Sequence, residues 1–272
     1  MKIAMFAAAL GATAMCVLAA PPALAQSALK YSGSLGIETH YQDYREPSIS
    51  VSETGYFVGG TAEGRIESDI WQLRGDIRYA VGSMDYTGSG RINDIDDTVF
   101  EGRLLVAVSM PFGDGGAHRA ISYVGYGYRY LLDELGGRTS TTGARGYDRI
   151  SQYHYVPIGL ETVIAAAGGW TFKPTVEYDY FISGSQDSKL SQAVAGLGDL
   201  SNSQDSGYGL RASFMAGTKL GTVPVEFGPF LRYWNIDNSD IGPVSYNGVT
   251  VAGGYEPANE TVEVGLAVKV WF

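Results

Sequence analysis

Apolar and polar residues alternate one by one in many stretches of this chain. In the C-terminal stretch the apolar set is Val262, Val264, Leu266, Val268, Val270 and Phe272, and it alternates with Glu263, Gly265, Ala267, Lys269 and Trp271. Residues 170–181 repeat the scheme, with Trp170, Phe172, Val176, Tyr178 and Tyr180 on one face and Lys173, Thr175, Glu177 and Asp179 on the other. Because successive side chains of a β-strand point to opposite faces, this period predicts strands with one apolar and one polar face.

Ten segments of this kind cover the chain after its first 30 residues. Their boundaries, good to about two to four residues, are 33–44, 54–66, 71–82, 98–110, 119–131, 149–164, 170–181, 207–218, 224–236 and 262–272. The lengths suit strands tilted across a bilayer. A sheet edge in lipid leaves backbone groups unpaired at several kcal/mol each, so the last strand must pair with the first. The pattern therefore predicts an all-β fold, a transmembrane antiparallel up-and-down barrel of about ten strands.

The connections distinguish this barrel from a soluble β-sandwich, which would show the same alternation. Alternate gaps are long, roughly 9 to 25 residues, and the gaps between them are short, roughly 4 to 8 residues, as in outer-membrane barrels. The long gaps are polar and acidic, as in 91–97, whereas short ones carry turn residues, as in 167–169. We expect five long loops on the outside and both termini on the periplasmic side.

Residues 1–25 form a separate unit at the N-terminus. Lys2 precedes an apolar run from Ile3 to Ala20, and Ala23-Leu24-Ala25 precedes Gln26. This order predicts a signal peptide cleaved between Ala25 and Gln26, with a retained membrane helix as the less favoured alternative. Residues 26–272 would then be one barrel domain without a thiol, since the one cysteine, Cys16, lies in the leader.

The chain ends on an aromatic strand. The segment 264–272, closing on Val270, Trp271 and Phe272, resembles the C-terminal signal that delivers outer-membrane barrels to their assembly machinery. A wider resemblance, to uncharacterised ten-stranded bacterial outer-membrane barrels of porin-like or omptin-like architecture, spans nearly the whole mature chain. The segments that carry this resemblance are 44–47, 125–130, 177–181, 232–235 and 256–261. It implies the barrel fold and a location in the outer membrane of a Gram-negative cell envelope, among lipid and lipopolysaccharide, but no activity.

Charged residues fall on the polar faces of these strands in nearly balanced numbers. The predicted ion-pair network of the lumen comprises Glu63, Arg65, Arg74, Asp76, Arg78, Glu101, Arg103, Arg129, Lys173, Glu177, Arg211, Glu226, Arg232, Glu263 and Lys269. The same parity places Glu38, His40, Glu161 and Asp179 inside. Eight strands leave an interior filled by side chains, whereas open channels have about 16 to 18, so we expect a salt-bridged plug. A selective channel and a ligand-binding lumen are the alternatives.

Tyrosines and tryptophans are frequent near the outer strand ends. A girdle at the membrane interface is favoured over a sugar-binding platform for these residues. The predicted girdle comprises Tyr126, Tyr128, Tyr130, Tyr153, Tyr155, Tyr178, Tyr180, Tyr233 and Trp234.

Candidate catalytic residues are few. The omptin proteases are ten-stranded barrels whose site, as the family is known, sets an Asp-His dyad against an aspartate pair. Here the acids would be Asp94, Asp96 and Asp97 and the bases His40 and His154, but the two histidines fall on opposite walls and lack the aspartate two residues away. General base catalysis needs hydrogen-bond reach, so we predict no catalytic residues and no enzyme.

Metal and nucleic-acid binding are not favoured either. The acidic stretch 94–97 lacks the twelve-residue calcium loop with its terminal Glu, so we predict no metal site and no cofactor. The net charge of −10 argues against nucleic acid as a partner. We therefore expect a monomeric barrel with a structural, surface-exposed or small-solute role. A rim hydrolase of the omptin kind and a narrow diffusion channel are the alternatives.

Overall fold

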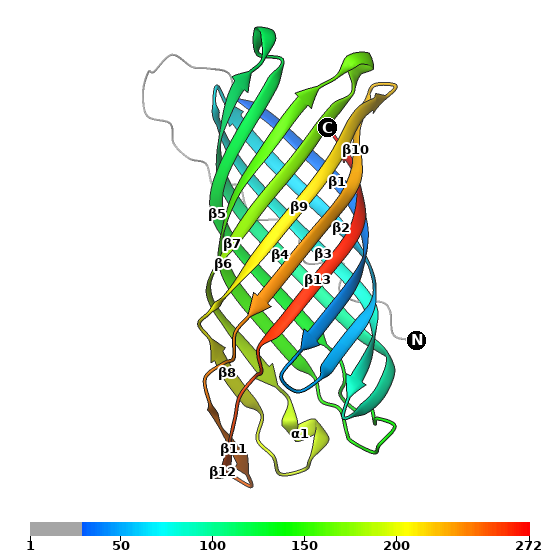
Figure 1. Ribbon diagram of the computed structural model, residues 1–272, viewed down its shortest axis with the longest axis vertical. Coiled ribbons are helices and arrows are strands. Elements are labelled where there is room, and N and C mark those ends of the chain that lie inside the picture. The colour runs from blue at the N-terminus through cyan, green and yellow to red at the C-terminus, as the bar shows by residue number, and fades with distance from the viewer. Residues whose placement is uncertain (1–28) are drawn as a thin grey trace.

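Ten antiparallel strands, each paired with its neighbour along the chain, form the wall of a barrel (Figure 1). They belong to a computed structural model that describes residues 29–272, so the predicted leader 1–25 and its cleavage point at Ala25 and Gln26 lie outside the described residues. The wall strands are β1 (Lys30–Glu46), β2 (Val51–Ser68), β3 (Trp71–Gly88), β4 (Gly90–Phe112), β5 (His118–Asp133), β6 (Arg149–Ala165), β7 (Thr171–Ser188), β9 (Gly207–Leu220), β10 (Val223–Ile236) and β13 (Asn259–Trp271).

The first and last wall strands close the barrel. β13 pairs antiparallel with β1, in the register that sets Leu35 opposite Val270. The pairing continues to the end of the chain, where Gly33 and Phe272 exchange two backbone hydrogen bonds of 3.0 and 2.9 Å. The prediction of a closed ten-stranded antiparallel barrel is confirmed, and closure satisfies the backbone of both strands without water.

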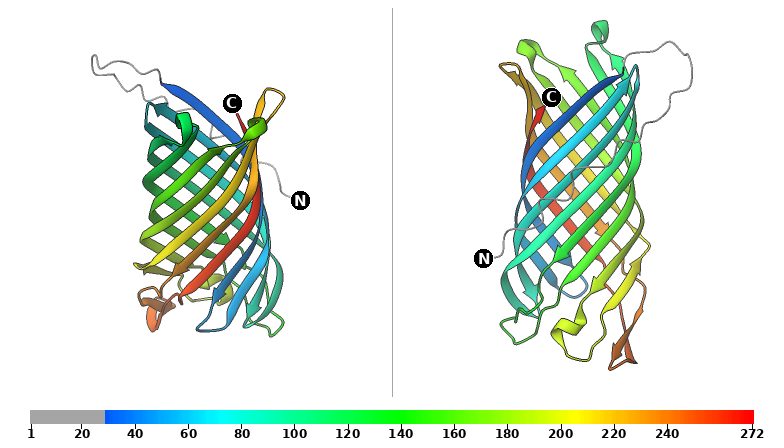
Figure 2. Two further views of the ribbon diagram at one scale, coloured as in Figure 1. Left: turned by 45° about the horizontal axis from the view of Figure 1, so that its top comes forward. Right: turned by 180° about the vertical axis from the view of Figure 1, so that it is seen from behind.

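The remaining elements lie in the connections at the two ends of the barrel. At one end α1 (Leu190–Ala193) and β8 (Leu200–Gln204), which extends the sheet beside β7, lie in the connection from β7 to β9. A hairpin of β11 (Gly242–Tyr246) and β12 (Val249–Gly254) projects from the connection of β10 to β13 at the same, lower end of Figure 1. The opposite end has short turns, two of which contain η1 (Asp114–Gly116) and η2 (Ala167–Gly169) (Figure 2). Among residues 29–272 there is no helix long and apolar enough to cross a membrane.

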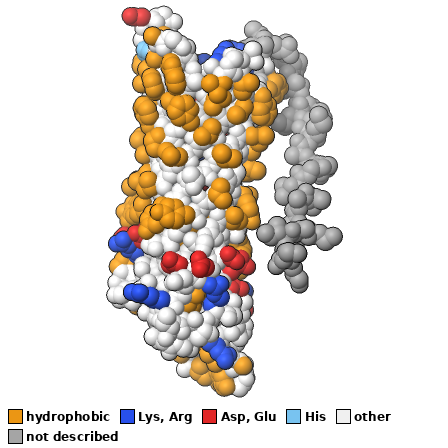
Figure 3. Space-filling view, turned by 90° about the vertical axis from the view of Figure 1, so that its right-hand side faces the viewer, with side chains coloured by type: hydrophobic (Ala, Val, Ile, Leu, Met, Phe, Trp, Pro, Cys, Tyr) orange, Lys and Arg blue, Asp and Glu red, His pale blue; other side chains and the backbone are white. Residues whose placement is uncertain are grey.

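Apolar side chains cover the outside of the wall. On β13, Val264 is 50% exposed and Leu266 60% exposed, whereas Glu263, the residue before Val264, is fully buried. Figure 3 shows apolar atoms over most of the height of one side, with charged groups gathered toward the end that carries the long connections. The predicted face assignment of the alternating segments is confirmed for these strands, and the outer face has the surface that lipid requires.

The prediction of five long loops is wrong for two of them. β1 and β2 are joined by only the four residues 47–50, and Ser89 alone separates β3 from β4. The stretch 91–97, predicted as an acidic loop, lies in β4 and pairs with β3. A hairpin that extends past the lipid-facing band keeps its backbone hydrogen bonds, but neither of its faces has to be apolar. The alternation of apolar and polar residues therefore stops in the sequence before the strand itself ends. The other three long connections, 134–148, 189–206 and 237–258, are present.

Candidate functional site

A buried carboxylate, Glu263 on β13, is the centre of the charged layer in the middle of the lumen. Arg78 of β3 donates to both of its oxygens, at 2.9 and 3.0 Å. Arg129 of β5 donates at 2.9 Å and Arg232 of β10 at 3.1 Å. Glu38 of β1 accepts a second bond from Arg232, at 2.9 Å. Charge-assisted hydrogen bonds of this kind are about twice as strong as neutral ones, so side chains from five strands are tied together across the lumen.

Glu101 on β4 forms a second centre beside the first. Arg211 of β9 donates to its two oxygens at 2.8 and 2.5 Å, and Arg78 donates at 2.9 Å. The hydroxyl of Tyr155 donates at 2.6 Å, and Arg211 also bonds Asp179 at 2.6 Å. Arg78 therefore joins the two centres, and the guanidinium of Arg211 crosses from β9 to β4.

A third group of ion pairs lies toward the end with the short turns. Arg103 bonds Asp76 and Glu177, both at 2.8 Å, and Tyr123 donates to Glu177 at 2.6 Å. The other pairs are Arg65 with Glu63 at 2.5 Å, Lys269 with Glu63 at 3.3 Å, Arg74 with Glu161 at 3.2 Å, and Lys173 with Glu226. The structure thus places each residue of the predicted ion-pair network inside the barrel and in contact with an opposite charge.

An apolar layer fills the lumen next to the charged one. Tyr153, Tyr155, Phe181, Trp234 and Ile236 form one buried cluster, with the rings of Tyr155 and Trp234 5.1 Å apart. The prediction that Tyr153, Tyr155 and Trp234 belong to a surface girdle is therefore wrong. Their parity already argued against it, because Tyr153 and Tyr155 share the face of Glu161, and Trp234 shares the face of Arg232. Tyr126, Tyr178 and Tyr180 do lie on the outer surface.

The two candidate bases lie on opposite faces of the wall. His40 is 2% exposed in the lumen, stacked on Phe57 at 4.9 Å, with ring nitrogens 3.8 Å from Glu38 and 3.9 Å from Glu263. His154 instead packs against Tyr126, whose hydroxyl lies 2.5 Å from Nδ1.

The candidate acids are divided in the same way. Asp94 and Asp96 are exposed, whereas Asp97 is buried in the lumen. The structure therefore does not bring His154 together with Asp97, and the contacts of His40 are to Glu38 and Glu263.

Arg149 on β6 organises the end of the lumen that faces the long connections. It donates to Glu46 at 2.6 Å and to the hydroxyl of Tyr44 at 3.0 Å, and it also bonds Glu256. Glu256 lies in the connection between β12 and β13, where burial raises the pKa of its carboxyl although Arg149 opposes the shift. Burial likewise raises the pKa of the Tyr147 hydroxyl. A cavity of about 360 Å³ lies between this group and the long connections.

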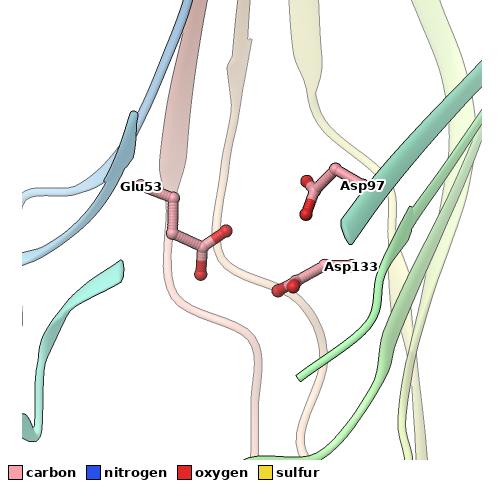
Figure 4. A group of neighbouring side chains, drawn as sticks. All are labelled: Glu53, Asp97 and Asp133. Atoms are coloured by element: carbon pink, nitrogen blue, oxygen red, sulfur yellow. The ribbon is translucent and has the colours of Figure 1, made fainter. Parts of the chain in front are cut away.

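Three further carboxylates gather beside Arg149, and we refer to Glu53, Asp97 and Asp133 as the rim carboxylates. One oxygen from each lies within 4.8 Å of the others (Figure 4). Glu53 comes from β2, Asp97 from β4 and Asp133 from the end of β5. Asp97 was expected beside Asp94 and Asp96, but in the structure it lies beside Glu53 and Asp133. The parity that Asp133 shares with Arg129 is the sequence signal that places Asp133 in the lumen.

The chain is similar to solved outer-membrane barrels. The outer-membrane protease OmpT from Escherichia coli superposes with a TM-score of 0.57 at 11% identity, over 90% of this chain and 96% of that one. The Ralstonia pickettii toluene transporter TbuX (TM-score 0.34, 9% identity, 88% of each chain) and the Pseudomonas putida toluene transporter TodX (0.33, 8%, 89% of this chain and 88% of that one) are more distant. No protein family and no curated protein matches the chain. The protein thus has the fold of an outer-membrane β-barrel.

Proposed function

We propose that this protein is a monomeric, integral barrel of the bacterial outer membrane with a structural or surface-exposed role and no enzymatic activity. Its apolar outer face would contact lipid and lipopolysaccharide, and the C-terminal strand with Val270, Trp271 and Phe272 would engage the barrel-assembly machinery. The proposal includes no cofactor and no nucleic-acid partner. What supports it is the filled lumen, in which ion pairs connect strands from opposite sides of the wall.

The bridge formed by Arg78, Glu101 and Arg211 is the observation that carries this proposal. It runs from β3 through β4 to β9, and the side chains of Arg78 and Glu101 are at most 5% exposed. Opening a path for solutes would leave several charges without partners, each at a cost of several kcal/mol. The spaces left between these side chains, of about 160 and about 120 Å³, are smaller than the roughly 300 to 1,000 Å³ of typical small-molecule sites. They suit buried water, which satisfies leftover polar groups.

A small-solute role would belong to the outer cavity. Its volume of about 360 Å³ lies within the range of small-molecule sites, and Arg149, Tyr147 and Asn202 supply polar groups in its lining. Such a solute would bind from outside without passing through the barrel. A narrow channel is a weaker alternative because the buried layer around Tyr155 and Trp234 fills the lumen between this cavity and the end with the short turns.

An omptin-like rim hydrolase is the alternative of another class. A hydrolytic site would need a base within about 3.2 Å of an activated water that also meets an acid. His154 lies outside the wall, and His40 is buried against Phe57 in the charged layer. Neither position offers a rim substrate a base beside Asp94 or Asp96.

Conductance in planar bilayers tests the plug. The refolded barrel should give a current close to that of bare lipid, whereas a double variant Arg211→Ala, Trp234→Ala should show discrete openings, which also proves insertion. Stable openings of the unaltered protein would contradict the proposal and favour the channel.

Turnover of peptide and lipid substrates tests the enzymatic alternative. The unaltered protein should show none above a heat-unfolded control. Turnover that disappears in His40→Ala or His154→Ala, with the barrel still folded by its heat-dependent electrophoretic mobility, would establish the hydrolase instead.

A further inference from the structure

Three acidic side chains meet in the lumen near the rim without the arginines that every acid in the middle of the barrel has. Asp97 and Asp133 are directly opposite each other in the register of β4 and β5. Like charges facing each other across a strand pair are destabilising. Glu53 reaches the same point from β2, so the three negative charges share one small volume (Figure 4).

Four of the six oxygens of these side chains are buried without a hydrogen-bond partner in the part of the chain that the structure describes. Glu53, Asp97 and Asp133 are 3%, 8% and 9% exposed. Both oxygens of Asp133, one of Asp97 and one of Glu53 are without a partner among the described residues. The nearest base is Arg149, which stands 4.0 Å from Glu53 and is already engaged by Glu46, Glu256 and Tyr44. Buried carboxylates that lack partners are costly, so this arrangement requires a further positive group.

We propose that the rim carboxylates bind one calcium ion, which ties β2, β4 and β5 together at the outer end of the barrel. Ca²⁺ accepts six to eight oxygen ligands at about 2.3 to 2.6 Å in a flexible geometry, and three carboxylates can supply up to six. Mg²⁺ requires a stricter octahedron and keeps several of its waters, which a site this buried does not favour. The ligands are oxygens only, which disfavours zinc.

The neighbourhood of the site favours a cation over a shared proton as the missing group. Glu46 and Glu256 add two more carboxylates around the single guanidinium of Arg149. The five acids therefore outnumber the one arginine, whereas in the middle layer Glu263 alone contacts three arginines. A divalent ion among the rim carboxylates would neutralise half of this excess.

The test measures calcium-dependent stability of the full barrel in detergent without lipopolysaccharide, so that no lipid phosphate contributes. After treatment with EDTA at pH 7, added Ca²⁺ should raise the thermal unfolding midpoint in a saturable way. A ligand at 100 times its Kd would give a rise of roughly 5 to 10 °C. Mg²⁺ at the same concentrations should give a clearly smaller rise, and Tb³⁺ should bind with sensitised luminescence that Ca²⁺ displaces.

Two variants and a matched control assign the effect to the site. Asp97→Asn and Asp133→Asn should each reduce the calcium-induced rise at least threefold and weaken Tb³⁺ binding. Asp96→Asn, an exposed neighbour of Asp97 in the chain, should leave both unchanged. The proposal is overturned if Ca²⁺ has no effect at pH 7, if Mg²⁺ acts equally well, or if the two site variants respond like Asp96→Asn.

Discussion

The middle of the lumen and its rim, at the end with the long connections, differ in how their buried charges are balanced. In the middle, Glu263 has hydrogen bonds from Arg78, Arg129 and Arg232, so each charge has several partners of opposite sign. At the rim, neither oxygen of Asp133 has a hydrogen bond from any residue of the range 29–272. Both groups of carboxylates are buried to a similar extent, so burial alone does not tell which one stabilises the barrel. The difference lies in the local balance of acids and arginines. Replacing a carboxylate by its amide should therefore lower the free energy of unfolding in the middle of the lumen and raise it at the rim.

The largest effect is expected where a carboxylate is removed from the balanced layer. Glu263→Gln leaves Arg78, Arg129 and Arg232 without the negative charge that they share and places an amide NH₂ among them, which should lower the free energy of unfolding by about 3 to 5 kcal/mol. Urea unfolding of the barrel in lipid vesicles measures it. Asp43→Asn, which breaks an exposed pair with Arg45, should change it by less than about 1 kcal/mol. Equal losses in the two variants would mean that the buried network adds nothing beyond a surface pair.

A gain in stability is expected from the same change at the rim. In EDTA, Asp133→Asn removes a carboxylate without partners and supplies an amide that can donate to Asp97 or Glu53. The free energy of unfolding should rise by about 1 to 3 kcal/mol, the cost of leaving such a group unsatisfied. The measurement is urea unfolding with EDTA present. A loss as large as that of Glu263→Gln would show that the rim carboxylates stabilise the barrel in the same way as those in the middle of the lumen.

The smallest effect concerns the pH dependence of the rim. The raised pKa of Glu256 means that the folded barrel binds more protons than the unfolded chain between the ordinary pKa, near 4.5, and the raised one. Its contribution therefore makes stability fall as pH rises through this window, by at most about 1.4 kcal/mol per pH unit.

Glu256→Gln should remove this contribution and flatten the curve of unfolding free energy against pH. Asp205→Asn, which changes an exposed carboxylate in another connection, should leave the curve as it is. A slope that Glu256→Gln leaves unchanged would assign the pH dependence to other groups.

Much of the wall was predictable because each strand carries its own two-faced pattern. All ten predicted segments are strands, and the parity of residues such as Arg78 and Glu263 placed them inside before any partner was known. Strand ends were not predictable, as the stretch 91–97 in β4 shows, because pairing outside lipid leaves no hydrophobic alternation. The clustering of aromatic residues near the strand ends predicted a girdle that included Tyr153, Tyr155 and Trp234, whereas their parity predicts the lumen, where the structure places them.

The alternation along the chain is enough to predict a sheet with an apolar and a charged face, and therefore a sheet that must close. Which charges meet depends on the folded barrel, because partners such as Arg78 and Glu263 are 185 residues apart and their contact depends on how closure and strand tilt set opposite walls against each other. Strand tilt and closure also bring together Glu53, Asp97 and Asp133, which come from three strands. Parity is a local property of each strand, whereas the balance of charge at one height of a barrel belongs to all of its strands together.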